Sequence, residues 1–148
     1  MEKTTYQQTS RLSAALVLLL LAVSAMAQTD VTSSIVNPSF DGRGFGGWRN
    51  FGFQTQTNSS FDGKTYKAYA EKWVAAGGTL ADSYLLQTIT GLSNGQYTLS
   101  VAAANTQNGS AASGAYLVGN QKTTSIGASG SYSVPVHVPD RTAAIGLK

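Results

Sequence analysis

Short runs of alternating apolar and polar residues, separated by turn-forming residues, fill the chain after about its first 30 positions. Alternation with a period of two is typical of strands that bury one face, and helical periodicity is missing. Only residues 75–82 leave room for a helical turn. The pattern predicts strands over residues 31–36, 48–57, 65–74, 84–90, 96–104, 115–118, 123–126, 132–138 and 143–147. Roughly nine short, evenly spaced strands indicate an antiparallel β-sandwich or barrel.

The first residues have the three regions of an export signal. Lys3 and Arg11 make the start positive, and residues 12–23 are almost all apolar. Ala25-Met26-Ala27 then supplies an A-x-A cleavage site. The apolar stretch is shorter than the roughly 20 residues that a membrane-spanning helix needs. We therefore expect a signal helix within a cleaved signal peptide, residues 1–27, and no stable membrane span after cleavage; an uncleaved anchor is the alternative.

The mature chain, residues 28–148, is long enough for one domain with a single core. It has no Cys, so it has no disulfide framework, which fits a bacterial export product. The whole sequence of 148 residues has a formal net charge of +3, and its Lys and Arg are scattered, so no nucleic-acid partner is expected. Only 11% of residues are charged. A neutral polar surface of this kind suits hydroxyl-rich partners, and the expected location is secreted, periplasmic or at the bacterial cell surface.

The chain ends on a pattern typical of the interior of a strand. Residues 143–148 read Ala-Ala-Ile-Gly-Leu-Lys, and neither a turn nor a polar tail follows them. A sandwich that closed there would leave an unpaired edge, which native sheets usually cover or blunt. We therefore expect the natural domain to continue past Lys148 with a final strand, and the full-length protein to carry further covalently linked domains.

Four segments resemble a known family when they are taken in order. They are Asn37-Pro38-Ser39-Phe40-Asp41, Gly47-Trp48, Glu71-Lys72-Trp73-Val74, and residues 87–100, which read Q-T-I-T-G-L-S-N-G-Q-Y-T-L-S. Over residues 31–148 they resemble the galactose-binding-like jelly-roll modules of bacterial polysaccharide-degrading enzymes and surface proteins. The last segment is the most specific of the four.

The resemblance implies an all-β fold of two antiparallel sheets in jelly-roll order, and carbohydrate binding without catalysis. No cofactor is required, but related modules often hold a structural calcium ion between the N-terminal segment and a last strand with an Asp-Asn-Phe-type motif. Asn37 and Asp41 lie where such metal ligands would come from, whereas the motif itself is absent from this sequence. Ca²⁺ takes six or more oxygen ligands, and two candidates do not complete a site.

Aromatic and amide side chains on neighbouring strands provide the candidate sugar site. The apolar C–H face of a pyranose ring stacks on a flat aromatic ring, and amides or carboxylates bind its hydroxyls. Trp73 is the expected platform, with Tyr69 and Glu71 beside it on the same strand face by the two-residue period. Gln87 on the next strand adds an amide. The alternative is that Trp73 belongs to the core, as we expect of Trp48.

Signatures of catalysis are missing from the sequence. Residues 42–47 match G-x-G-x-x-G, but a strand pattern follows them instead of the helix that a dinucleotide site needs. The single histidine, His137, lies between two prolines in an edge-like strand. Glycoside hydrolysis needs two facing carboxyl groups, and Glu71 is the one acid expected inside a strand beside aromatic residues. We therefore expect no enzyme activity, although the chain could be an accessory fragment of a glycoside hydrolase.

Two functions from different classes agree with these features. The first is an exported, non-catalytic carbohydrate-binding module that anchors a larger enzyme or surface assembly to a polysaccharide or oligosaccharide. The second is a structural or adhesion β-sandwich that acts as a spacer and has no sugar site. An exposed aromatic residue on the concave face favours the first, and a face of Thr, Ser and Ala alone favours the second.

Overall fold

The computed structural model divides the chain into two units, Met1–Val31 and Thr32–Lys148. It describes residues 29–41, 44–61, 64–75, 78–107 and 110–148. The expected signal peptide, residues 1–27, lies outside these ranges. Within them, no helix is long and apolar enough to cross a membrane.

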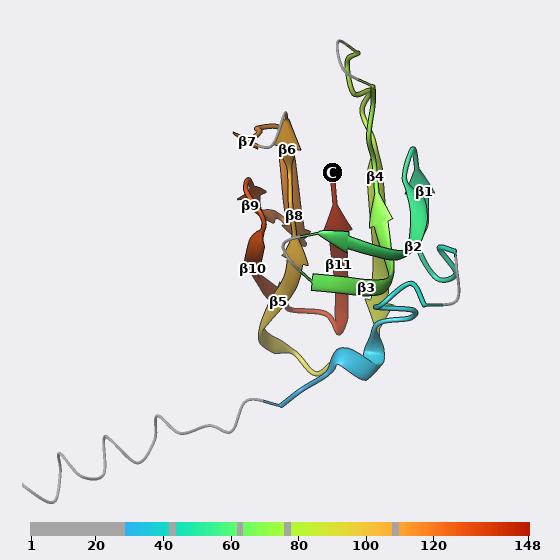
Figure 1. Cartoon of the computed structure of the whole chain (residues 1–148). Coiled ribbons are helices and arrows are strands. Elements are labelled where there is room, and N and C mark those ends of the chain that lie inside the picture. Colours follow the sequence, from blue (N-terminus) through green and yellow to red (C-terminus); the bar gives the residue numbers. More distant parts are fainter. Residues whose placement is uncertain (1–28, 42–43, 62–63, 76–77, 108–109) are drawn as a thin grey trace, which may run out of the picture. The chain divides into compact units, whose positions relative to one another are not determined.

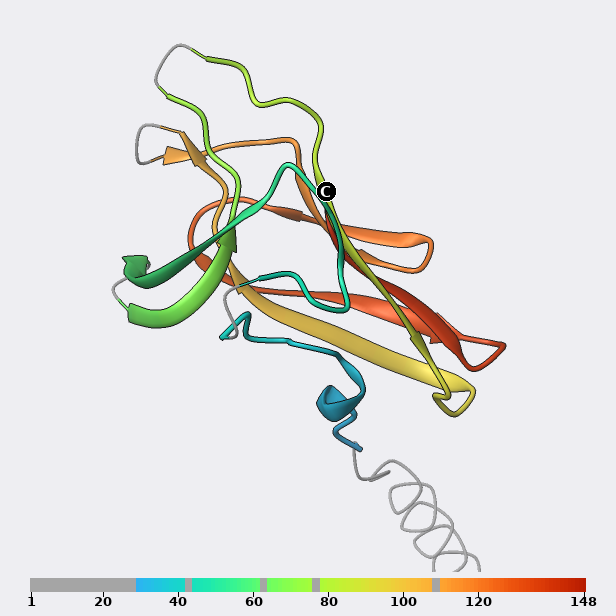
Figure 2. The same ribbon diagram turned by 90° about the vertical axis from the view of Figure 1, so that its right-hand side faces the viewer.

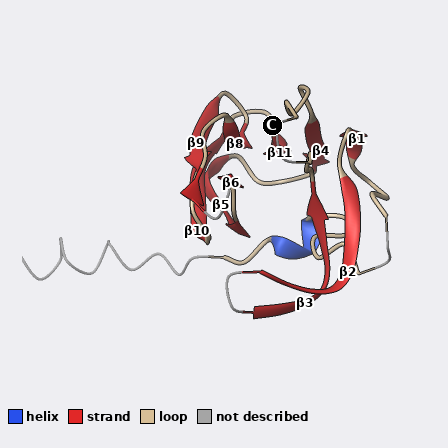
Figure 3. Cartoon of the chain, turned by 45° about the horizontal axis from the view of Figure 1, so that its top comes forward, coloured by secondary structure: helices blue, strands red, loops and turns tan. Residues whose placement is uncertain are grey.

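Strands account for almost all of the regular structure between Thr32 and Lys148 (Figure 3). The helix that the structure describes is a short 3-10 turn, η1 (Thr32–Ser34). The strands are β1 (Arg49–Phe51), β2 (Gln54–Phe61), β3 (Lys64–Glu71), β4 (Tyr84–Thr90), β5 (Gly95–Ala103), β6 (Thr106–Gln107), β7 (Ser110–Ala111), β8 (Ala115–Gly119), β9 (Lys122–Ile126), β10 (Gly130–Val138) and β11 (Thr142–Leu147). The all-β prediction is therefore confirmed.

Two antiparallel layers form the body of Thr32–Lys148. The larger is a five-stranded sheet with the order β1-β4-β11-β8-β9 (Figure 1). In the smaller layer β10 pairs with β5 along its whole length, and β10 also packs against β8, β9 and β11 (Figure 2). β2 and β3 pair only with each other, as do β6 and β7.

The core lies between the two layers and consists of the inward positions of alternating strands. Val134, Val136 and Val138 of β10 are buried, while the residues between them are exposed. Facing them, Gly119 of β8 leaves no room for a side chain, because a Cβ there would lie 2.7 Å from Val136 Cγ2. Fully burying one such apolar side chain stabilises a fold by about 1.5–3 kcal/mol. The other buried apolar residues are Ala68, Leu85, Ile89, Leu92, Leu117, Ile126, Ala143 and Ile145.

Most strand boundaries agree with the sequence pattern. The six strands predicted from residue 84 onward are confirmed to within two residues at each end. The strand predicted over residues 48–57 is wrong as a single element, because Gly52 adopts a left-handed conformation (φ 85°) that separates β1 from β2. Residues 105–114, expected as a loop, contain the short β6 and β7. In the segment 75–82, a single turn is closed by the Gly78 N–H, which donates to the Ala75 carbonyl (2.9 Å).

The strand predicted over residues 31–36 is also wrong, because η1 occupies part of this segment. Where a neighbouring strand would have paired with the segment, a side chain of β4 makes the hydrogen bonds instead. Gln87 of β4 points inward and is only 4% exposed. The Val36 N–H donates to Gln87 Oε1 (2.8 Å), and Gln87 Nε2 donates to the Val36 carbonyl (2.9 Å). Trp48 Nε1 donates to the same carbonyl (2.8 Å). The amide of Gln87 thus offers Val36 the donor and acceptor that a neighbouring backbone would otherwise provide.

The last strand lies inside the larger sheet. β11 pairs with β4 on one side and β8 on the other, so the unpaired edge expected at residues 143–147 is not found. Gly146 makes this close pairing possible. A Cβ at this position would come within 2.9 Å of both Leu85 C and Leu86 Cα, backbone atoms that have no freedom to rotate away.

We expect Gly146→Ala to lower the free energy of unfolding by at least ~2 kcal/mol, since its methyl group would overlap the β4 backbone. Chemical denaturation measures the change. Gly46→Ala is the matched control, because a Cβ at Gly46 has no atom within 4 Å. Equal stability of the two variants would contradict the close approach of β11 to β4.

We expect Gln87→Met to lower the free energy of unfolding by about 2 kcal/mol, since it keeps the side-chain length but removes both hydrogen bonds to Val36. Thr88→Val, at the neighbouring exposed position of β4, is the control and should change stability by less than about 0.5 kcal/mol. A Gln87→Met variant as stable as the wild type would show that the Val36 segment is held by other contacts.

Candidate functional site

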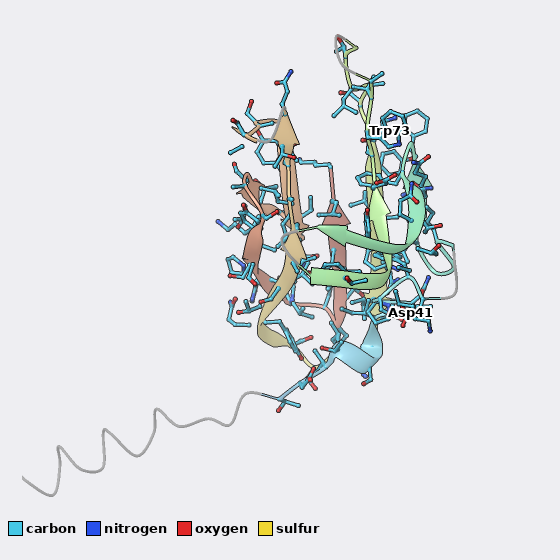
Figure 4. All side chains as sticks on the ribbon, in the orientation of Figure 1. Asp41 and Trp73 are labelled. Carbon is cyan, nitrogen blue, oxygen red and sulfur yellow. The ribbon has the colours of Figure 1, made fainter. Side chains whose placement is uncertain are left out.

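Three aromatic side chains gather where β1 ends and β4 begins. Phe51 is the register partner of Tyr84, and the two rings stack with centroids 5.8 Å apart and planes inclined by 29°. Figure 4 places Trp73 beside this end of the sheet. Trp73 is 62% exposed and Phe51 is 58% exposed. Phe51, Trp73 and Tyr84 are termed the aromatic corner.

The local sequence places the rings of Phe51 and Tyr84 on the outer face of the five-stranded sheet. In β4 the buried Leu85 and Gln87 point inward, so Tyr84 points outward by the two-residue period, and so does its partner Phe51. Trp73 follows the end of β3 in the segment that leads to β4. The chain before it lies close to β1, because a Cβ on Gly52 would be 3.1 Å from Lys72 Nζ.

Positive charge borders the aromatic corner. The Arg49 guanidinium carbon lies 5.8 Å from the centroid of the Tyr84 ring, which is within the range of a cation–π interaction. Lys72 brings its ammonium group to Gly52, next to Phe51. The corner therefore combines flat apolar rings with N–H donors that are able to bind hydroxyl or carboxylate oxygens.

The predicted sugar site around β3 is not assembled as the sequence suggested. β3 ends at Glu71, so the strand face that carries Tyr69 and Glu71 does not continue to Trp73. The Glu71 carboxylate instead joins the β2–β3 hairpin, where its Oε1 accepts hydrogen bonds from Gln54 Nε2 (2.6 Å) and Gln56 Nε2 (2.8 Å). Tyr69 makes an edge contact with Tyr66, with ring centroids 6.3 Å apart.

Gln87 does not belong to the candidate sugar site, because its amide is buried and binds the Val36 backbone through both polar atoms.

The two tryptophans differ in their exposure. The core alternative for Trp73 is wrong, since most of this side chain is exposed. Trp48 is half-buried, and its ring lies 5.6 Å from that of Phe40.

Both residues predicted to bind calcium have polar partners in the structure. Asn37 Nδ2 donates to the Gly44 carbonyl (2.9 Å), and the Asp41 carboxylate lies 3.9 Å from Lys67 Nζ. The calcium site stays a prediction from the sequence. Among the residues that the structure describes, no group of three or more His, Cys, Asp or Glu side chains could hold a metal ion.

Sequence reasoning missed Phe51 and Tyr84 as site residues. A single strand over residues 48–57, as predicted, would carry Phe51 and Phe53 on one face by the two-residue period, but Gly52 ends β1 between them. The sequence of β4 could have identified Tyr84. The apolar residues at positions 85 and 89 mark the inner face of the strand, so the two-residue period predicts that Tyr84 points outward.

Comparison with known proteins does not extend this description, because no protein-family model, curated protein or solved structure matches the chain. The resemblance to galactose-binding-like modules therefore stays a prediction from the sequence.

We expect Trp73→Ala to change the free energy of unfolding by less than about 0.5 kcal/mol, because the side chain is mostly exposed. Trp48→Phe is the matched comparison. It removes the indole N–H that binds the Val36 carbonyl and should cost about 1 kcal/mol in the same denaturation experiment. A larger loss of unfolding free energy for Trp73→Ala than for Trp48→Phe would mean that Trp73 is a core residue.

Proposed function

We propose that the protein is an exported, non-catalytic carbohydrate-binding module, of the galactose-binding-like jelly-roll type, whose sugar platform is the aromatic corner. The observation that supports this most is the exposure of Trp73 and Phe51 next to Tyr84 at one end of the sheet. In this proposal the module is secreted, periplasmic or held at the cell surface of a bacterium, and it anchors a larger enzyme or surface assembly to a polysaccharide.

The proposal has a direct physical basis. Large aromatic side chains that are exposed next to each other cost free energy in water, because their apolar area is hydrated. Such patches on soluble domains usually mark binding sites. A sugar ring removes this apolar area from water with its C–H face, while its hydroxyls point sideways toward polar groups. Arg49 and Lys72 are close enough to the corner to donate hydrogen bonds to those hydroxyls.

Binding without cleavage agrees with the environment of Glu71. This was the acid that the sequence favoured most, and its carboxylate accepts two amide hydrogen bonds inside the β2–β3 hairpin. A glycosidase needs a second carboxyl group facing the first across the sugar. Binding without cleavage is sufficient for an anchoring module, because tethering raises the effective concentration of a linked domain at the polymer surface.

A screen of the full chain against immobilised neutral and acidic polysaccharides tests the proposal. We expect retention on at least one polymer, and at least about a tenfold loss of affinity for Trp73→Ala and for Phe51→Ala, since each removes one stacking surface. Isothermal titration with a soluble form of the retained polymer measures the loss.

Thr98→Ala is the control variant for this screen, because Thr98 is exposed on β5, in the other sheet. It should bind as the wild type does. Failure of the wild type to bind any polymer would contradict the proposal and favour the spacer function. Equal losses for Thr98→Ala and Trp73→Ala would mean that the aromatic corner is not the platform.

A further inference from the structure

We infer that the ligand is an acidic polysaccharide with uronate carboxylates, and that it lies across the outer face of the five-stranded sheet, from the aromatic corner to Tyr116. This inference rests on the proposed function and extends it in two respects. It gives the chemical class of the sugar, and it adds Tyr116 and Lys148 to the binding surface.

A row of outward side chains crosses the sheet at one level. Phe51 of β1 is the register partner of Tyr84 in β4. The β11–β4 register, continued by one residue, puts Lys148 opposite Tyr84. Lys148 is also opposite Tyr116 of β8, with which it exchanges both backbone hydrogen bonds (2.6 and 3.0 Å). Paired residues of neighbouring strands point to the same face, so these four residues form one row.

Each tyrosine of this row has a cation beside its ring. Lys148 Nζ lies 5.9 Å from the centroid of Tyr116, and Arg49 lies 5.8 Å from that of Tyr84. The two cations therefore belong to the same face as the rings, and each is held near a surface on which a sugar can stack. A sugar bound along this row would have a positive group nearby, within reach of a uronate carboxylate.

The outward strand positions of this face carry no acidic side chain. Its outward strand positions are Arg49, Phe51, Tyr84, Leu86, Thr88, Thr90, Tyr116, Val118, Thr123, Ser125, Thr142, Ala144 and Gly146. None of these strand residues, all of which the structure describes, is acidic. Lys148 stands between the two tyrosines in the row, and the small Ala144 and Gly146 follow it along β11 at the centre of the sheet.

The dimensions suit a chain of several sugars. Neighbouring strands are about 4.8 Å apart, so Tyr84 and Tyr116, separated by one strand, lie roughly 10 Å apart. Phe51 extends the row by one more strand, to roughly 14 Å in all. The row is therefore longer than a single sugar ring, and its two ends are both aromatic.

The number and spacing of the cations favour carboxylates over a more densely charged ligand. The planar fork of Arg49 matches a carboxylate in a bidentate arrangement. Two cations on an otherwise neutral face balance an occasional negative charge along a polymer. A nucleic acid carries a phosphate at every nucleotide and would need a denser basic cluster than Arg49 and Lys148 provide.

Paired ligands test the inference. The full chain is titrated with polygalacturonate and with the same polymer after its carboxyl groups have been reduced to hydroxyls. We expect the wild type to bind the acidic form at least about fivefold more tightly, and this preference to fall as salt is raised. We expect Arg49→Gln with Lys148→Gln to lose about tenfold in affinity for the acidic form and clearly less for the reduced form, which has no carboxylate to pair with the two cations.

Lys122→Gln is the matched control, because it removes the same charge from the exposed start of β9 and should keep the wild-type affinity. Tyr116→Ala tests the extent of the row and should weaken binding of both polymers. Equal binding of the two polymers by the wild type, or an equal loss for Lys122→Gln, would overturn the inference and leave the proposed function standing. Absence of binding to every polysaccharide in the earlier screen would remove the proposed function itself.

Discussion

The packing of the N-terminal segment onto the sandwich depends on a side chain that takes the place of a strand. A peptide segment that is brought against a sheet needs partners for its N–H and C=O groups. The segment after η1 has no neighbouring strand at Val36, and the buried amide of Gln87 supplies both partners there. Trp48 adds a third hydrogen bond to the same carbonyl, and its ring packs against Phe40. The only buried polar side chain that the structure describes is therefore also the one that fixes this segment.

Two faces of the same sheet then serve different purposes. Inward residues of β8 and β11 pack against β10, and the inward Leu85 and Ile89 of β4 are also buried in the core. Outward residues of the same strands carry the aromatic corner, the row that ends at Tyr116 and the cations beside the rings. Because side chains alternate along each strand, the rigidity of the core fixes the spacing of the rings on the other face.

The sequence predicted the later strands well, because in β4 and β10 buried and exposed residues alternate without interruption. It failed where one residue changed the local geometry. Gly52 divides one apparent strand into two. The end of β3 at Glu71 removes Trp73 from the face of Tyr69. Gln87 looked like a ligand because a polar residue in a strand is usually exposed, and its long-range partner Val36 is not visible in any local pattern.

Among the strands that the structure describes, those of the β2–β3 hairpin pair only with each other, as those of β6–β7 do, so no ladder joins the hairpin to the two layers (Figure 1). Its described polar contacts include the pair of glutamine amides on the Glu71 carboxylate. A unit with its own ladder is able to open while the sandwich stays intact, so its backbone amides should exchange with deuterium sooner than those of β11. Such independent opening would let the hairpin change its shape without disturbing the strand register of the larger sheet.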